Sequence, residues 1–178
     1  YQCFSAFAGN NLLISPEKLV EDGLVSAADI ADHPEFTEHK VDFQSVQNWK
    51  TQLLPKAYAG FHHTTSVDLR GKFETFCREN EHWLDEYALF RSIKTTQNER
   101  PWYEWPDPLK LRYGSTLREM AEELFDEIQA HKFYQFLFFS QWYSLKAYAN
   151  QNGVRIIGDI PIFVALDSAD VWCDQDKI

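Results

Sequence analysis

The chain has 178 residues, of which 44% are hydrophobic and 25% are charged, and its formal net charge is −10. This composition is typical of a folded globular protein without a membrane-spanning segment, and the negative charge disfavours nucleic acid and anionic membranes as partners. Three separated cysteines, Cys3, Cys77 and Cys173, form no CxxC motif, which disfavours zinc and a disulfide framework and favours a reducing cytoplasm.

The first 14 residues predict a loop that leads into a short helix. Small residues dominate the opening YQCFSAFAGN, and its last two residues, Gly9 and Asn10, are turn formers. Ser15 is then typical of a helix N-cap, because Pro16 follows it at the first helical position.

The middle of the chain predicts helices with a clear apolar face. Residues 26–45 are polar and acidic and predict a loop with one short helix, whereas residues 46–70 are ambiguous because Pro55 interrupts a helical spacing. Residues 71–94 predict a helix, because large apolar side chains recur at spacings of three, four and seven. These side chains are Phe73, Phe76, Cys77, Trp83, Leu84, Tyr87, Phe90 and Ile93.

A proline-rich stretch over residues 95–114 predicts a loop, yet it contains three large aromatic residues, Trp102, Tyr103 and Trp105. Aromatic rings stack on the C–H faces of sugars, and they also fill protein cores. Both interpretations stay open for these three side chains.

The strongest helical patterns come next. Residues 115–130 place apolar side chains on one face and acidic side chains on the other, with Thr116 and Glu119 at the spacing of a capping box. Residues 133–150 are long enough for a helix but apolar on nearly every side, which predicts a helix buried in a larger body. Gly153 is expected just beyond the end of this helix.

The β-branched run VRIIGDIP, residues 154–161, predicts a buried parallel strand directly after this helix. Pro161 cannot donate to a ladder, so the strand is expected to end near Asp159 or Ile160. In parallel α/β folds the carboxyl ends of the strands face the ligand site, which makes Asp159 a candidate for substrate binding. Capping of the following loop is the competing role for this carboxylate.

The opening YQCFSAFAGN and the segment GDIPIFVALDSADVW resemble the amylomaltases, which are the 4-alpha-glucanotransferases, or disproportionating enzymes, of glycoside hydrolase family 77. A weaker similarity runs through YALFRSIK at residues 87–94. The resemblance covers essentially the whole chain and is loose over residues 26–80. It implies an α/β fold, a fragment of a (β/α)8 TIM barrel with a large helical insertion.

The resemblance also implies how the chain is divided. Residues 1–14 are expected to form a barrel loop after an absent second strand, and residues 15–130 a mainly helical insertion. Residues 131–178 are expected to supply a barrel helix, the third barrel strand and the following active-site loop. A whole barrel needs about 250 residues, and the first residue here is Tyr1, so we expect an internal fragment.

The activity implied by the family is transfer of an α-1,4-glucan segment to the 4-hydroxyl of an acceptor glucose or glucan, by a retaining double displacement. α-1,4-Glucans and maltooligosaccharides are the expected substrates, and no cofactor, metal, nucleic acid or membrane is expected. The catalytic carboxylates of the family belong to later strands, so the isolated chain is expected to be inactive. The implied substrate-binding residues are Tyr1, Ser5, Asn10 and Asp159.

Two other functions stay open. An α-amylase-like glycoside hydrolase would use related carboxylate chemistry but would release reducing ends without elongating any chain. A non-catalytic glucan-binding or structural module is the alternative that the missing carboxylates favour for the isolated chain.

Overall fold

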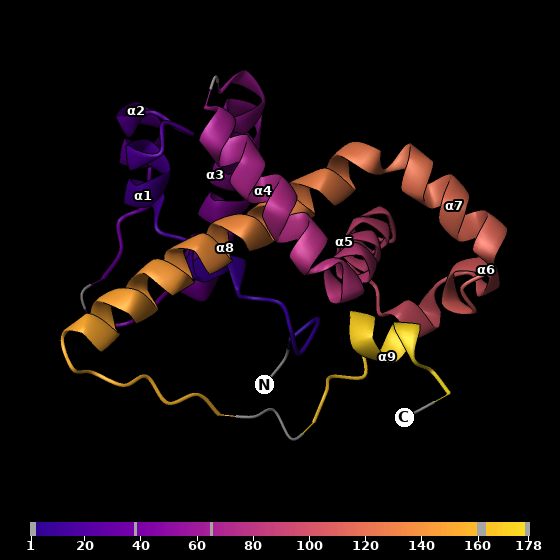
Figure 1. Cartoon of the computed structure of the whole chain (residues 1–178). Helices are drawn as coiled ribbons and strands as arrows, with labels where there is room; N and C mark the ends of the chain where they lie inside the picture. The colour runs from indigo at the N-terminus through magenta and orange to yellow at the C-terminus, as the bar shows by residue number, and fades with distance from the viewer. Residues whose placement is uncertain (1–2, 38, 65, 160–162, 177–178) are drawn as a thin grey trace.

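The computed structural model describes residues 3–37, 39–64, 66–159 and 163–176, which form helices joined by turns and irregular segments (Figure 1). The helices are the 3-10 turns η1 (Asn11–Leu13) and η2 (Trp102–Glu104) and the α-helices α1 (Pro16–Glu21), α2 (Ala27–Ala31), α3 (Phe43–His63), α4 (Val67–Glu79), α5 (Glu81–Thr96), α6 (Asp107–Lys110), α7 (Gly114–Glu123), α8 (Phe125–Gln151) and α9 (Ala169–Cys173). None of the described helices combines the length and hydropathy needed to cross a membrane.

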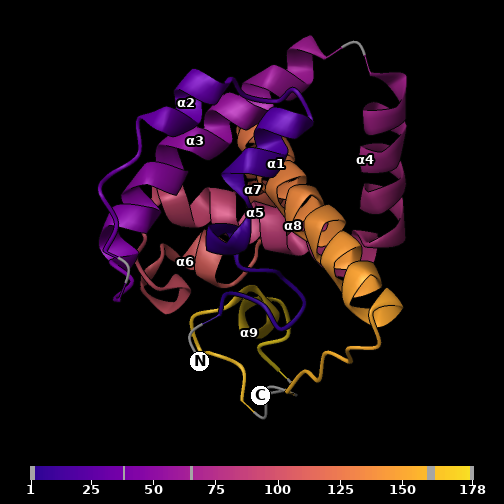
Figure 2. The ribbon, with the colours of Figure 1, turned by 90° about the vertical axis from the view of Figure 1, so that its left-hand side faces the viewer.

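Helix α8 is the centre of the arrangement, because α3, α4, α5 and α7 all pack against it (Figures 1 and 2). An aromatic cluster fills the contact between α8 and its neighbours α3 and α4. The Phe133 ring lies 4.6 Å from that of Phe61, 5.7 Å from that of Phe73 and 6.0 Å from that of Phe136, between centroids. Full burial of such a side chain contributes about 1.5–3 kcal/mol, so this cluster is a major source of stability.

Helix α3 resolves the region that the sequence leaves ambiguous. It continues through Pro55, although proline removes one backbone donor and destabilises a helix interior. Four apolar side chains on one face, Leu53, Leu54, Ala57 and Phe61, are buried. Tertiary packing of this face therefore outweighs the unfavourable local propensity.

The apolar face predicted over residues 71–94 is confirmed, but it belongs to two helices instead of one. Helices α4 and α5 meet at Asn80, whose amide nitrogen donates to the Phe76 carbonyl over 2.9 Å. The Asn80 side-chain oxygen accepts from the indole nitrogen of Trp83 over 3.1 Å. A side chain that bonds locally in this way competes with the helical ladder, which gives a physical reason for the break.

The helix boundary predicted near residue 130 lies earlier in the structure, at Leu124, which alone separates α7 from α8. The capping box expected at Thr116 and Glu119 is wrong, because α7 already begins at Gly114 and has no side-chain cap. Gly153 follows the end of α8 with φ of 74°, the left-handed conformation expected of a glycine at that position.

The aromatic stretch that follows α5 belongs mainly to the core. Trp102 and Trp105 are buried, and their indole nitrogens donate to the carbonyls of Leu166 over 2.6 Å and Arg100 over 3.0 Å. Tyr103 is the exposed member of the three. Core packing is therefore the correct interpretation of the two tryptophans.

The strand predicted at residues 154–160 is not formed in the described part of the chain. Residues 154–159 have no regular secondary structure and run along the lower edge of Figure 1. Their apolar side chains are exposed, and Ile157 reaches 92% exposure. A strand is held by hydrogen bonds to a neighbouring strand, and the described residues contain no second strand. The expectation of α/β content is thus corrected to a helical structure over these residues.

Candidate functional site

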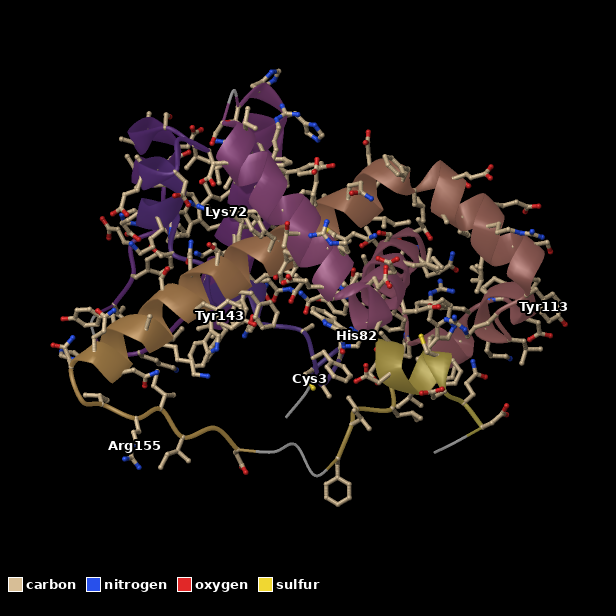
Figure 3. All side chains as sticks on the ribbon, in the orientation of Figure 1. Cys3, Lys72, His82, Tyr113, Tyr143 and Arg155 are labelled. Carbon is tan, nitrogen blue, oxygen red and sulfur yellow. The ribbon has the colours of Figure 1, made fainter. Side chains whose placement is uncertain are left out.

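The four predicted substrate-binding residues come from two segments. Tyr1 lies outside the described residues, whereas Ser5 and Asn10 lie in the segment from Cys3 to Asn10, called the N-terminal loop below. Figure 3 shows Cys3 between α8 and α9, on the same side of α8 as Arg155. The fourth residue, Asp159, lies in the irregular segment that follows α8.

Ser5 is buried, and its hydroxyl group is bound within the chain. Its oxygen donates to Asp170 over 2.8 Å and accepts from the backbone nitrogen of Phe7 over 3.1 Å. The second oxygen of Asp170 accepts from the Ala6 nitrogen over 2.6 Å. The Asp170 carboxylate therefore fixes the middle of the N-terminal loop to helix α9.

The far end of the N-terminal loop is fixed by Gln135 of α8, a residue that the sequence interpretation missed. The Gly9 nitrogen donates to Gln135 Oε1 over 2.8 Å, and Gln135 Nε2 donates to the Gly9 carbonyl over 3.0 Å. Gln135 Nε2 also lies 2.9 Å from Asn11 Oδ1. The available signal was an uncharged amide in an apolar run, because a buried amide needs hydrogen-bond partners.

Two further polar side chains fix the chain after the loop. Gln141 of α8 accepts from the Ser15 nitrogen over 2.7 Å and donates to the Ser15 carbonyl over 3.3 Å. Buried Lys50 of α3 donates to the Ile14 carbonyl. Desolvation lowers the pKa of the Lys50 ammonium to about 8.

Asn10 is exposed and only partly bound. Its side-chain oxygen accepts from the Leu12 nitrogen over 3.0 Å, which caps η1. Its amide nitrogen makes no hydrogen bond to the described residues, so its two N–H groups are free to donate to a ligand.

Asp159 is exposed as well, and its carboxylate makes no hydrogen bond or ion pair with the residues that the structure describes. No hydrogen bond between described residues joins it to the N-terminal loop. Its side chain is therefore open to solvent on the edge of the molecule, where an ionised carboxylate accepts hydrogen bonds.

Three polar residues in the second half of the motif GDIPIFVALDSADVW fix the fold around α9. Asp167 pairs with Lys94 of α5, and Ser168 caps α9 by accepting from the Val171 nitrogen over 3.3 Å. Asp170, as described above, binds the N-terminal loop. These three polar residues of the motif each have a structural partner, whereas Asp159 has none among the described residues.

A groove of about 660 Å³ lies elsewhere, between α4 and α8. Figure 3 labels Lys72 and Tyr143, which line this groove from the two helices. None of the three described site residues, Ser5, Asn10 and Asp159, lines it. Within the described residues no group of three or more histidine, cysteine, aspartate or glutamate side chains is placed to hold a metal ion.

Comparison with known proteins gives a consistent result over the whole chain. Residues 1–178 match the family model of glycoside hydrolase family 77, described as 4-alpha-glucanotransferase. The 4-alpha-glucanotransferase of Thermus thermophilus is 45% identical over 176 residues, which are 99% of this chain and 34% of that protein. The 4-alpha-glucanotransferase of Synechocystis is 39% identical over 177 residues, 99% of this chain and 35% of that protein.

The fold is similar to that of an amylomaltase from Streptococcus agalactiae, solved in complex with acarbose. The TM-score is 0.91 at 31% sequence identity, and the match covers 99% of this chain and 35% of that one. The chain thus spans about a third of the length of the relatives that it matches. On this evidence, the chain belongs to the 4-alpha-glucanotransferase family, glycoside hydrolase family 77.

Proposed function

We propose that the chain is part of a 4-alpha-glucanotransferase that moves a segment of an α-1,4-glucan to the 4-hydroxyl of an acceptor glucose or glucan. Family membership over all 178 residues supports this activity. The reaction is a retaining double displacement, with catalytic carboxylates supplied by sequence outside these residues. The isolated chain is then inactive. Free cysteines fit a reducing cytoplasm as the location of the enzyme.

In this proposal the chain forms one side of a (β/α)8 barrel. Residues 1–14 are a barrel loop, residues 15–130 a helical insertion, and residues 131–178 a barrel helix, the third strand and an active-site loop. The exposed apolar run at residues 154–159 supports the strand, because β-branched side chains favour pairing when neighbouring strands are present. The exposed side chains of Tyr143, Leu145 and Tyr148 on α8 give this side further apolar surface to bury.

The single observation that carries the site assignment is the exposed carboxylate of Asp159, which has no partner among the residues that the structure describes. At the carboxyl end of a barrel strand it would face the substrate, and it would accept hydrogen bonds from sugar hydroxyls. Asn10 would donate to sugar hydroxyls from its free amide nitrogen, and Tyr1 would contribute a ring for stacking. Ser5 would act indirectly, by shaping the loop, because its hydroxyl already binds Asp170.

The test is product analysis of the complete protein with maltotriose. Transfer predicts glucose together with chains longer than the substrate, and acarbose, which is bound in the Streptococcus agalactiae relative, is expected to inhibit. Reducing ends without elongation would establish the α-amylase-like hydrolase in its place. The isolated chain serves as the inactive control.

A non-catalytic glucan-binding module is tested with the isolated chain and maltoheptaose. Micromolar binding by calorimetry would support that class, because our proposal leaves the isolated chain with only one side of the cleft. Absence of binding together with transfer by the complete protein is the expected pair of results.

A further inference from the structure

Resting on the proposed function, we propose that Gln135 is a positioning residue that orients the glucan-contacting end of the N-terminal loop. Gln135 is fully buried on α8, with 0% of its surface exposed. Its carboxamide binds both polar groups of Gly9, accepting from the nitrogen over 2.8 Å and donating to the carbonyl over 3.0 Å. A glutamine amide has a donor and an acceptor in one plane, so this pair of bonds fixes the direction of the peptide.

The same side chain also fixes the residue on the other side of Asn10. Gln135 Nε2 donates to Asn11 Oδ1 over 2.9 Å. Asn10 therefore lies between two residues that share one anchor, while its own amide nitrogen makes no hydrogen bond to any described residue. This arrangement sets where Asn10 presents its two N–H donors to a sugar.

Close packing against α8 strengthens the positioning. A Cβ atom at Gly9 would lie 1.9 Å from Cδ1 of the Phe138 ring, so the backbone of the loop rests directly on that ring. Phe138 follows Gln135 by three positions, which places both side chains on one face of α8. The Gln135 amide thus fixes the loop backbone by hydrogen bonds, and the Phe138 ring packs directly against it.

The Gln135 amide has one further contact besides the loop, because its Nε2 atom lies 3.5 Å from the hydroxyl oxygen of buried Tyr87 on α5. The neighbouring side chains of Phe136 and Leu137 are buried and apolar, so an apolar side chain at position 135 would leave the polar groups of residues 9 and 11 without a partner from this turn of α8. Asp170 already fixes the loop at Ser5 and Ala6. The bonds of the Gln135 amide to the loop are confined to residues 9 to 11, and its remaining contact is to Tyr87 of α5.

The experiment compares Gln135→Leu with Gln141→Leu in the complete enzyme. Gln141 is a matched control, because it binds the nitrogen and carbonyl of Ser15 in the same manner, beyond the N-terminal loop. For Gln135→Leu we expect KM for maltotriose to rise about tenfold while kcat changes less than about twofold, the pattern of lost substrate binding. For Gln141→Leu we expect both constants to stay within about twofold of those of the unsubstituted enzyme.

Gln135→Glu provides a rescue that a general loss of stability would not show. Burial raises the pKa of a carboxyl group, and the protonated acid again offers one donor and one acceptor to Gly9. The ionised form would instead repel the Gly9 carbonyl. We therefore expect KM of this variant, relative to the unsubstituted enzyme at the same pH, to fall as the pH is lowered from about 8 to about 5.

The outcomes separate this inference from the proposed function. Failure of the unsubstituted protein to elongate maltotriose would refute the proposed function and the glucan-contacting role of the loop with it. Normal transfer with an unchanged KM in Gln135→Leu would overturn the positioning role alone. A rise in the KM of Gln141→Leu equal to that of Gln135→Leu would do the same. Unaltered hydrogen exchange of the Gly9 amide in Gln135→Leu would overturn it as well.

Discussion

Lys94 of α5 and Asp167, which precedes α9, form an ion pair with 2.6 Å between Nζ and Oδ2. The Lys94 ammonium also donates to the Arg100 carbonyl over 2.9 Å. The other Asp167 oxygen accepts from the Trp102 nitrogen over 3.2 Å. The Lys94 side chain is only 2% exposed, and this pair joins Asp167 of the segment GDIPIFVALDSADVW to the helical body.

Removal of the counter-charge of the buried Lys94 ammonium is expected to be costly. Asp167→Ala leaves the Lys94 ammonium without a counter-charge, and we expect a loss of about 3–5 kcal/mol in the free energy of unfolding. The control is Glu21→Ala, which breaks an exposed pair with Lys18, with side chains 67% and 50% exposed, and should cost less than about 1 kcal/mol. Urea unfolding followed by tryptophan fluorescence measures both; equal losses would contradict the prediction.

Two helical glycines are expected to respond oppositely to the same substitution. A Cβ at Gly60 in α3 would lie 2.0 Å from the Leu24 carbonyl oxygen, a backbone atom that cannot move aside cheaply. At Gly71 in α4 an added Cβ would have no atom of the described residues within 4 Å, apart from its chain neighbours and the backbone of its own helix. We expect Gly60→Ala to destabilise by about 1–3 kcal/mol and Gly71→Ala to stabilise by about 0.5–1 kcal/mol, the helix propensity difference. Thermal unfolding distinguishes the two substitutions. A change in stability of the same sign for both would contradict the structure at Gly60.

The helical body was predictable from sequence because its burial follows the period of a helix. The face from Phe73 to Ile93 is buried as expected, since it packs against α8. The breaks at Asn80 and Leu124 were not predictable, because neither position has glycine or proline. At Asn80 side-chain hydrogen bonds to Phe76 and Trp83 accompany the break, and spacing of apolar residues does not record them.

The predicted strand is not formed in the described residues, and the anchors Gln135 and Asp170 were missed by the sequence analysis, for one shared reason: their partners lie outside the local sequence. Residues 154–159 have strand propensity, but a strand requires a neighbour that the described residues lack. Gln135 binds Gly9, 126 residues away, and Asp170 binds Ser5, 165 residues away. Local patterns assign such polar residues no partner, so only coordinates reveal that they fix the N-terminal loop.

His131 on α8 is expected to make stability depend on pH. Burial, with a contribution from the charge of Arg91, lowers its pKa from the ordinary 6.5 to about 3. Its Nδ1 atom is buried without a hydrogen-bond partner among the described residues. Between these two pKa values the unfolded chain binds the proton and the folded chain does not, so stability falls as the pH is lowered through that range.

The measurement is the free energy of unfolding of His131→Phe against that of the unsubstituted chain as a function of pH. The difference between the two should be constant above about pH 7.5 and should then change by up to about 1.4 kcal/mol per pH unit below about pH 6, the slope for one proton. A difference that stays constant down to about pH 4 would show that His131 is protonated in the folded chain.

Asp159→Ala should separate activity from stability. The carboxylate has no partner among the described residues, so the substitution should change the free energy of unfolding by less than about 0.5 kcal/mol. Loss of a charged hydrogen bond to a sugar hydroxyl, about 1.5–3 kcal/mol, should lower transfer on maltotriose by about tenfold to a hundredfold in the complete enzyme. Arg155→Ala, in the same exposed segment, is the control and should keep normal transfer. Normal turnover of maltotriose by Asp159→Ala would remove this carboxylate from the site, because no other described contact gives it a role.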